Sequence, residues 1–209
     1  MTAVQLSRFG YKVFALTYKA ESIAGLQAEA NTSNLVCLQC DVTKDDDIKR
    51  VVASVEQQSP EGLKYVPCVH VGAKYKHSGL INNAGINAGS FIDWSSDKDF
   101  RNVMEVNYFA MVNVTKAFLP LLRKQKGKSR IINITSVVAF LPLAGIATYT
   151  ASKHAAQAFS DVLRQELAPW RIPVIVIQPG CMKTPLVSGG ATAIETAWKN
   201  RMLASLEDR

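Results

Sequence analysis

Tyr149 and Lys153 have the residue types and the spacing that a proton-transfer site needs. Residues four apart lie on one face of a helix, so the phenol and the ammonium can converge on one point. Reduction of a carbonyl requires a proton donor beside the hydride acceptor, and the reverse reaction requires a base. A free phenol titrates near pH ~10, and a neighbouring ammonium lowers that pKa because it stabilises the phenolate. The pair taken alone is also common on the surface of ordinary helices.

Ser136 strengthens the case for chemistry at this pair. It ends the apolar segment RIINITS, thirteen residues before Tyr149, and we predict that segment to be a strand. The carboxyl end of a strand in a parallel α/β sheet faces the crevice where ligands bind. A hydroxyl there can hydrogen-bond a substrate oxygen and stabilise the negative charge that develops on it. The alternative is that Ser136 only caps a turn after the strand.

Apolar runs alternate with helical patterns along the chain, which predicts an α/β fold: a Rossmann-like, doubly wound parallel sheet with helices on both faces. We predict strands at residues 12–16, 35–40, 79–82, 130–135 and 174–178. We predict helices at residues 20–30, 44–57, 98–125, 148–168 and 193–206. Residues 66–78 show neither a helical nor a strand period, so we predict an irregular insertion there. It would lie within a single incomplete domain that covers residues 1–209.

The start of the chain departs from the usual dinucleotide-binding sheet. Such a sheet opens with a strand, a Gly-rich turn and a helix whose N-terminus faces the pyrophosphate. Here VQLSRFG resembles the later part of that helix, closed by Gly10, and no G-x-G-x-x-G occurs. We therefore expect the first strand, the phosphate loop and the C-terminal strand to be missing, and we expect weak or no cofactor binding by the chain as given. Two hypotheses follow: an enzyme whose full chain is longer, or an inactive relative that acts as a binding or regulatory partner.

The composition is that of a globular protein, with 48% hydrophobic and 20% charged residues. The net charge of +7 is spread along the chain, and its densest run, residues 123–130, fits a solvated helix end and loop. No nucleic-acid-binding signature accompanies it, so we expect no nucleic-acid partner. No run of 18 apolar residues and no signal-peptide core occur, so we expect a cytoplasmic or organelle-associated protein.

Cys37 and Cys40 form a C-x-x-C, which is a pattern of zinc and redox sites. Both lie within a predicted strand, and no second Cys/His pair has the spacing of a zinc site. We therefore predict buried thiols and no metal.

From Gly10 to about Thr184 the chain resembles the short-chain dehydrogenase/reductase family. The resemblance rests on a set of motifs in family order: NNAG at residues 82–85, Asn107, Ser136, Tyr149, Lys153, and Pro179-Gly180 with Thr184. It implies an NAD(P)-dependent oxidoreductase that transfers a hydride between a nicotinamide and a carbonyl or alcohol. The segment FSDVLRQEL at residues 159–167 resembles the branch that contains retinol, hydroxysteroid and 3-hydroxybutyrate dehydrogenases.

The resemblance assigns four catalytic residues. Tyr149 would be the general acid/base, and Lys153 would lower its pKa and hold the nicotinamide ribose. Ser136 would orient and polarise the substrate oxygen. Asn107 would help to position a water that connects Lys153 to solvent. The family also forms dimers or tetramers through its two long helices, here at residues 98–125 and 148–168, so we expect a homo-oligomer that acts on a small alcohol or carbonyl compound.

The resemblance also assigns the contacts of the cofactor. Asp41 would bond the adenine amino group beside Val42, and residues of the NNAG segment, Asn83, Ala84 and Gly85, would line the adenosine ribose. Pro179, Gly180 and Thr184 would contact the nicotinamide end. The cofactor is predicted to be NAD or NADP. Lys19 follows the predicted strand where NAD-preferring members carry an acid, so it favours NADP if it pairs a 2′-phosphate, although a solvated loop lysine is equally consistent.

Overall fold

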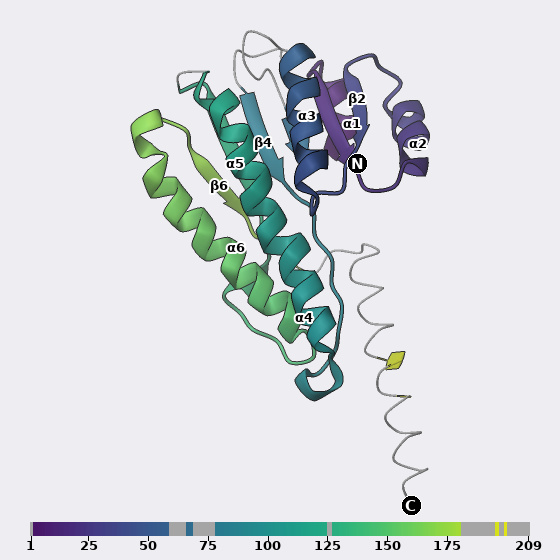
Figure 1. The fold of residues 1–209 in the computed structure, drawn as a ribbon, viewed down its shortest axis with the longest axis vertical. Helices are drawn as coiled ribbons and strands as arrows, with labels where there is room; N and C mark the ends of the chain where they lie inside the picture. Colours follow the sequence, from purple (N-terminus) through teal and green to yellow (C-terminus); the bar gives the residue numbers. More distant parts are fainter. Residues whose placement is uncertain are drawn as a thin grey trace, which may run out of the picture.

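Parallel strands form the centre of the molecule, and helices cover both of their faces (Figure 1). The computed structural model describes residues 2–58, 66–68, 78–124, 127–180, 195–196 and 199. Alternate side chains of β1 (Val13–Thr17) enter two different hydrophobic clusters, because successive side chains of a strand point to opposite faces. Val13 and Ala15 pack with Val4 of the first helix, whereas Phe14 packs in the larger cluster with Leu80 and Val114. The predicted doubly wound α/β fold is therefore confirmed.

The strands form two hydrogen-bonded groups. β1 pairs in parallel with β2 (Leu35–Gln39). The second group runs in the order β3 (Val66–Cys68), β4 (Ser78–Asn82), β5 (Ser129–Ile134) and β6 (Val174–Ile177), and it is also parallel throughout. Five of these strands were predicted from the sequence, with ends that differ by at most one residue.

β3 was not predicted, because it lies within the segment for which an irregular insertion was expected. It pairs with β4 and lies beside β1, so it joins the two groups of strands. In the strand order 3-2-1-4-5-6 that is typical of dinucleotide-binding sheets, this is the position of the first strand. Its three residues include Pro67, which has no N–H to donate to a ladder. Residues 69–77 of the same segment lie outside the described residues.

The helices begin with α1 (Thr2–Arg8). Gly10, two residues beyond its end, closes the helix as predicted; it has a φ of +85°, a conformation that glycine adopts without strain. The others are α2 (Glu21–Ala30), α3 (Asp45–Gln58), α4 (Asp97–Met104), α5 (Ala110–Arg123) and α6 (Ala147–Glu166), with short 3₁₀ turns η1 (Ile92–Trp94), η3 (Val137–Ala139) and η4 (Ala168–Trp170). Most of the helix predicted at residues 193–206 lies outside the described residues. The three residues of this range that the structure describes, 195, 196 and 199, are helical.

The long helix predicted at residues 98–125 is interrupted by one π-helical turn. α4 passes directly into η2 (Glu105–Phe109), which has π geometry, and η2 passes into α5. A single π turn inserted in an α-helix shifts the side chains that follow and occurs often at functional sites. Asn107 lies at the centre of this turn and is completely buried.

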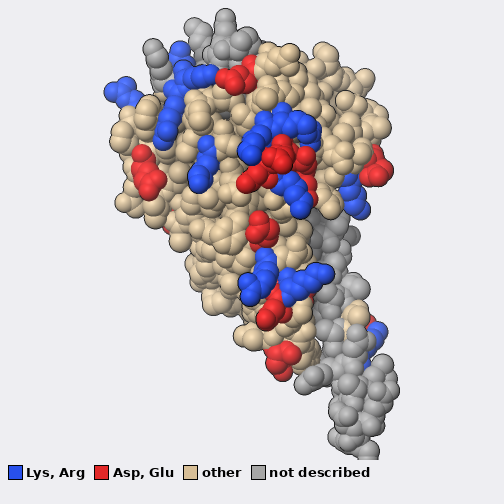
Figure 2. Space-filling view, in the orientation of Figure 1, with Lys and Arg blue, Asp and Glu red and all other residues tan. Residues whose placement is uncertain are grey.

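Positive and negative side chains are mixed on the face seen in Figure 2, where basic residues adjoin acidic ones rather than forming one basic field. Part of this mixture comes from pairs on α3, where Lys49 bonds Asp46 and Arg50 bonds Asp47. Such exposed pairs contribute at most about 1 kcal/mol each to folding stability.

Candidate active site

Asn107 forms hydrogen bonds through both the oxygen and the nitrogen of its side-chain amide, and these join η2 to the segment after β4 and to α6. Its Oδ1 accepts a hydrogen bond from the backbone N–H of Ile86 at 2.8 Å, and its Nδ2 donates to the backbone oxygen of Ile86 at 2.9 Å. The second proton on Nδ2 goes to Ser152 Oγ, also at 2.9 Å. The π turn thereby fixes both the segment after β4 and the start of α6.

Ser136 lies just beyond β5 and touches the predicted acid/base. Its side chain accepts a hydrogen bond from the backbone N–H of Val138 at 3.4 Å, so it caps the turn η3. It also hydrogen-bonds the side chain of Tyr149. The two interpretations of Ser136 in the sequence, a turn cap and a partner of the reacting group, are therefore compatible in one side chain.

Burial raises the pKa of Tyr149, and the hydrogen bond with Ser136 lowers that pKa by a smaller amount. A low-polarity environment disfavours the charged phenolate, which is why desolvation has this direction. The net direction is opposite to the lowering that we expected from Lys153, so desolvation exceeds the stabilisation of the phenolate by this chain's own residues.

Lys153 is buried, with 3% of its surface exposed, on the same face of α6 as Tyr149. Its Nζ donates to the backbone oxygen of Ile134 at 3.0 Å and lies 5.5 Å from the centroid of the Tyr149 ring. Burial lowers the pKa of Lys153 to about 8, because an ammonium in a low-polarity environment loses its hydration. The structure thus brings Asn107, Ser136, Tyr149 and Lys153 to one place, as the sequence predicted.

Ser152 is a member of this group that the sequence did not identify. It is completely buried, accepts the hydrogen bond from Asn107, and donates to the backbone oxygen of Tyr149 at 2.7 Å. It therefore connects the π turn to the turn of α6 that carries the tyrosine. A serine between a tyrosine and a lysine on a helix gives no signal in the sequence that would set it apart from a surface residue. We call Asn107, Ser136, Tyr149, Ser152 and Lys153 the catalytic cluster, after the role that the family resemblance implies for four of them.

A second buried network lies beneath the catalytic cluster. Asn82, the last residue of β4, donates from Nδ2 to Thr115 Oγ1 at 3.0 Å and to Asn133 Oδ1 at 2.8 Å. Asn133 in turn donates to Ser160 Oγ at 2.8 Å. These bonds join β4, β5, α5 and α6. Asn82 therefore stabilises the sheet, and the other members of this network, Thr115, Asn133 and Ser160, were not predicted.

The predicted adenosine contacts converge on a cleft of about 500 Å³. It is lined by Leu16, Tyr18, Cys40, Asp41, Val42, Thr43, Asn83, Ala84, Gly85, Ile86, Asn102 and Val106. Five of the predicted cofactor residues are in this lining: Asp41, Val42, Asn83, Ala84 and Gly85. Tyr18 and Thr43 are lining residues that the sequence analysis did not select.

Gly85 connects the cleft to the catalytic cluster. A Cβ at this position would lie 3.4 Å from Asn107 Oδ1 and 3.5 Å from Lys153 Nζ, so a larger side chain would fill the space beside the lysine. The missing side chain leaves room for a ligand to approach the backbone there. The residues of the cleft and the cluster therefore fit an extended group such as a dinucleotide, with one end at Asp41 and the other at Lys153.

Three of the other predicted cofactor residues lie elsewhere. The side chain of Lys19 is exposed and is not in the lining of the cleft. Pro179 follows β6, and its backbone oxygen accepts the N–H of Val137 at 3.0 Å, which places this segment next to the turn after Ser136. Gly180 comes directly after it, and no atom of the described residues lies within 4 Å of the position that a Cβ would take. Thr184 lies outside the described residues.

Cys37 and Cys40 are free thiols on and just after β2. Burial raises the pKa of both, that of Cys40 to about 11, so they stay protonated at neutral pH. A protonated thiol is a poor nucleophile and a poor metal ligand.

The catalytic cluster can move a proton at one point, the hydroxyl of Tyr149. A substrate oxygen placed beside this hydroxyl would also be within reach of Ser136, and Lys153 would supply positive charge behind the ring. That combination fits the interconversion of an alcohol and a carbonyl.

Comparisons with known proteins agree with this geometry. The family model described as short chain dehydrogenase matches residues 1–192. Rat estradiol 17-beta-dehydrogenase 2 is 38% identical over 191 residues, which are 88% of this chain and 45% of the relative. Mouse retinol dehydrogenase 16 is 33% identical over 197 residues, which are 94% of this chain and 57% of the relative. Among solved structures, an NAD⁺-bound xylitol dehydrogenase is 25% identical with a TM-score of 0.74, covering 89% of this chain and 66% of that one.

The chain thus spans about half of the length of these two curated relatives. Among the described residues, no helix is long and apolar enough to cross a membrane.

Proposed function

Since this chain belongs to the short-chain dehydrogenase family, we propose that it is an oxidoreductase that interconverts an alcohol and a carbonyl compound with a nicotinamide cofactor. The observation that carries the proposal is that Tyr149 lies beside two buried side chains, Ser136 and Lys153, and that the Lys153 ammonium borders the space at Gly85. Burying polar and ionisable groups costs folding stability, and groups with shifted pKa values gather at functional sites. A cluster of this kind therefore favours a catalytic role.

In reduction, Tyr149 gives the proton of its hydroxyl to the oxygen of the carbonyl. Ser136 hydrogen-bonds the same oxygen and stabilises the charge on it. Lys153, held by the backbone oxygen of Ile134, stabilises the phenolate that remains. In oxidation the same residues act in reverse, and Tyr149 is the base. The nicotinamide, when bound, supplies or accepts the hydride.

The cofactor would extend from the Asp41 end of the cleft to Lys153. Asp41, Val42, Asn83, Ala84 and Gly85 would hold the adenosine half, while Pro179, Gly180 and Thr184 would contact the nicotinamide half. NAD and NADP are both nicotinamide cofactors of this kind. Lys19 follows the cleft residue Tyr18 in the sequence, and an ammonium at this position would pair with a 2′-phosphate, so we favour NADP.

The substrate that we propose is a large apolar alcohol or ketone of the retinoid or steroid kind. Two loops that flank the N-terminus of α6 expose large apolar side chains: Phe91 and Ile92 on one, and Phe140, Leu141 and Leu143 on the other. Thr148, in the first turn of α6 and just after the second loop, donates a hydrogen bond from its hydroxyl to the backbone oxygen of Ala88, just before the first loop. This bond holds the two loops close to each other. The two curated relatives named above are an estradiol and a retinol dehydrogenase, which supports this substrate class.

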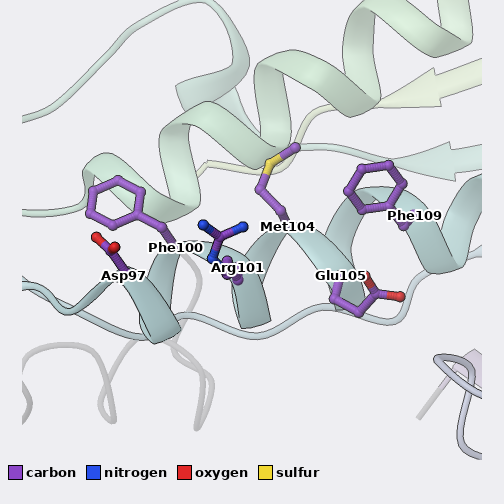
Figure 3. Close-up of a pocket in the computed structure, with 6 residues that line it drawn as sticks. All are labelled: Asp97, Phe100, Arg101, Met104, Glu105 and Phe109. Atoms are coloured by element: carbon purple, nitrogen blue, oxygen red, sulfur yellow. The ribbon is translucent and has the colours of Figure 1, made fainter.

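We also propose that two copies associate through α4 and η2. Phe100, Met104 and Phe109 point to one side of this helix and line a groove of about 520 Å³ (Figure 3). Asp97, Arg101 and Glu105 line the same groove, so a two-fold contact would bring Arg101 of one copy to the acidic residues of the other. Phe109→Asp should therefore convert a dimer to a monomer in light scattering; an unchanged mass would contradict the proposal.

The test of the function is a fluorescence titration with NADH and NADPH, on this chain and on a form extended at its N-terminus by a Gly-rich strand, turn and helix. We expect the extended form to bind a cofactor and to oxidise retinol or estradiol. Failure of both forms to bind either cofactor would contradict the proposal.

A further inference from the structure

The turn that follows β2 holds Asp41 with one of its carboxylate oxygens already bonded. Oδ1 accepts a hydrogen bond from the Thr43 hydroxyl at 2.7 Å and a second from the Thr43 backbone N–H at 3.0 Å. Two donors on one oxygen fix both the rotamer and the plane of the carboxylate. Among the described residues, none donates a hydrogen bond to Oδ2 of Asp41, so this oxygen is the one available to a ligand.

The backbone of the same residue is held from the other side. The N–H of Asp41 donates to Asp47 Oδ2 at 2.8 Å. Arg50 donates to Asp47 Oδ1 at 2.7 Å and to the backbone oxygen of Gln39 at 3.0 Å. Main chain and side chain of Asp41 are therefore fixed independently, the main chain by Asp47 and the side chain by Thr43.

Asp41 and Thr43 both line the cleft, together with the apolar residues Leu16 of β1 and Ala84, two residues beyond β4. Leu16 and Ala84 offer apolar surface on which a planar ring can lie. A carboxylate oxygen at the edge of such a surface accepts hydrogen bonds and cannot donate them while it is ionised. It selects a ring that carries an amino group at that edge and disfavours one that carries a carbonyl oxygen there.

We propose that Thr43 is a positioning residue for adenine recognition: its hydroxyl holds the Asp41 carboxylate so that the second oxygen meets the amino group of the adenine ring. This inference rests on the proposed function, because it presupposes a dinucleotide in the cleft. It goes beyond that function in assigning the discrimination between an amino and a carbonyl substituent to a hydrogen bond within the protein. The competing explanation is that the Thr43 bonds only shape the turn before α3.

The experiment compares two cofactors in one titration. One is whichever of NADH and NADPH the protein binds more tightly, and the other is its hypoxanthine analogue, in which a carbonyl oxygen replaces the amino group. Thr43→Val removes the hydroxyl and keeps the shape, and Thr43→Ser is the matched control that keeps the hydroxyl. Asp41→Asn removes the carboxylate itself. All four proteins are titrated in the form that binds cofactor, with the Kd as readout.

We expect Thr43→Val to weaken the binding of the adenine cofactor about fivefold and to change the binding of the hypoxanthine analogue by less than about twofold. The variant misplaces the Asp41 carboxylate, which costs a hydrogen bond to the adenine amino group, and the analogue has no amino group there to lose. Thr43→Ser should bind both like the unchanged protein. Equal weakening of both cofactors in Thr43→Val would show a merely structural turn and overturn the inference. No effect of Thr43→Val beside a selective loss in Asp41→Asn would also overturn it, while the proposed function would stand. No binding by the unchanged protein would overturn the proposed function itself.

Discussion

The catalytic cluster and the Asp41 turn form the two ends of the proposed cofactor site, and they are held in different ways. In the cluster, Asn107 is fully buried and Lys153 nearly so, and the polar atoms bond one another across η2, α6 and the end of β5. In the Asp41 turn (residues 39–50) the bonds are short-range, and they involve half-exposed side chains such as Asp47 and Arg50. Tyr18, at the edge of the same end, is 70% exposed.

The proposed function accounts for this difference. Proton transfer at Tyr149 would require its hydroxyl to lie within hydrogen-bond distance of the substrate oxygen, so its surroundings would have to be fixed from several elements at once. Recognition of a planar ring tolerates more movement, because most of it comes from apolar contact and from a few hydrogen bonds. We therefore expect substitutions in the cluster to have large effects on stability and on turnover, and substitutions in the turn to have small ones.

The largest effect on stability is expected for Asn107→Leu. The substitution leaves the N–H and the carbonyl of Ile86 without their partners, while Ser152 loses the bond that it accepts and keeps the one that it donates to Tyr149. Each unpaired group costs about 1–3 kcal/mol, so the free energy of unfolding should fall by about 2–6 kcal/mol. Urea denaturation measures it, and Ser152→Ala, which removes one of these bonds, should lose less. A loss below about 1 kcal/mol for Asn107→Leu would refute the account of the cluster.

A pH-dependent effect is expected from Lys153. Its pKa is about 8 in the folded protein and near the ordinary 10.5 in the unfolded chain. Between these values the unfolded chain binds more protons, so the free energy of unfolding should rise with pH from about 8 to about 10.5, by up to about 3 kcal/mol. Below pH 8 this contribution is absent, because both states are protonated.

The control for this prediction is Lys153→Met, which keeps a chain of similar length without the charge. Between pH 7.0 and pH 10.0, the unfolding free energy measured by urea denaturation should rise more in the unchanged protein than in the variant. The contributions of all other titrating groups are the same in both proteins and cancel in this comparison. Parallel pH profiles would mean that Lys153 is hydrated in the folded protein, and the burial on which the catalytic cluster depends would be wrong.

The smallest effect is expected in the Asp41 turn. Arg50→Gln removes an exposed i,i+3 pair with Asp47, and such pairs contribute at most about 1 kcal/mol. The pKa of Asp47, which the hydrogen bond from Arg50 lowers, should rise in the variant. Carboxyl titration followed by NMR measures that pKa, and urea denaturation measures the stability. A loss of stability above about 2 kcal/mol would remove the contrast between the two ends.

The arrangement of strands could be predicted well from the sequence, and the reason is visible in β1. Val13 and Ala15 face one cluster and Phe14 the other, so both faces are buried and the strand is apolar throughout. A short apolar run between turn residues is sufficient to recognise such a strand. β3 could not be predicted in this way, because three residues that include Pro67 are too few to show a period.

Long-range features of the site escaped prediction for physical reasons. The π turn around Asn107 depends on contacts with Ile86 and Ser152, which lie 21 and 45 residues away along the chain. The direction of the Tyr149 pKa depends on its burial, which the sequence does not reveal. By contrast, the positions of Ser136, Tyr149 and Lys153 were found from the sequence, because a strand end and an i, i+4 pair are local patterns.

Turnover by Tyr149→Phe is the most direct test of the proposal that this hydroxyl transfers the proton. The substrates are NAD⁺ or NADP⁺ with retinol or estradiol, and the protein is the form that binds cofactor. Phenylalanine keeps the ring and removes the hydroxyl, so cofactor affinity should stay within about twofold while kcat falls at least about 100-fold. A variant with the kcat of the unchanged protein would contradict the account, because the proton would then come from another group.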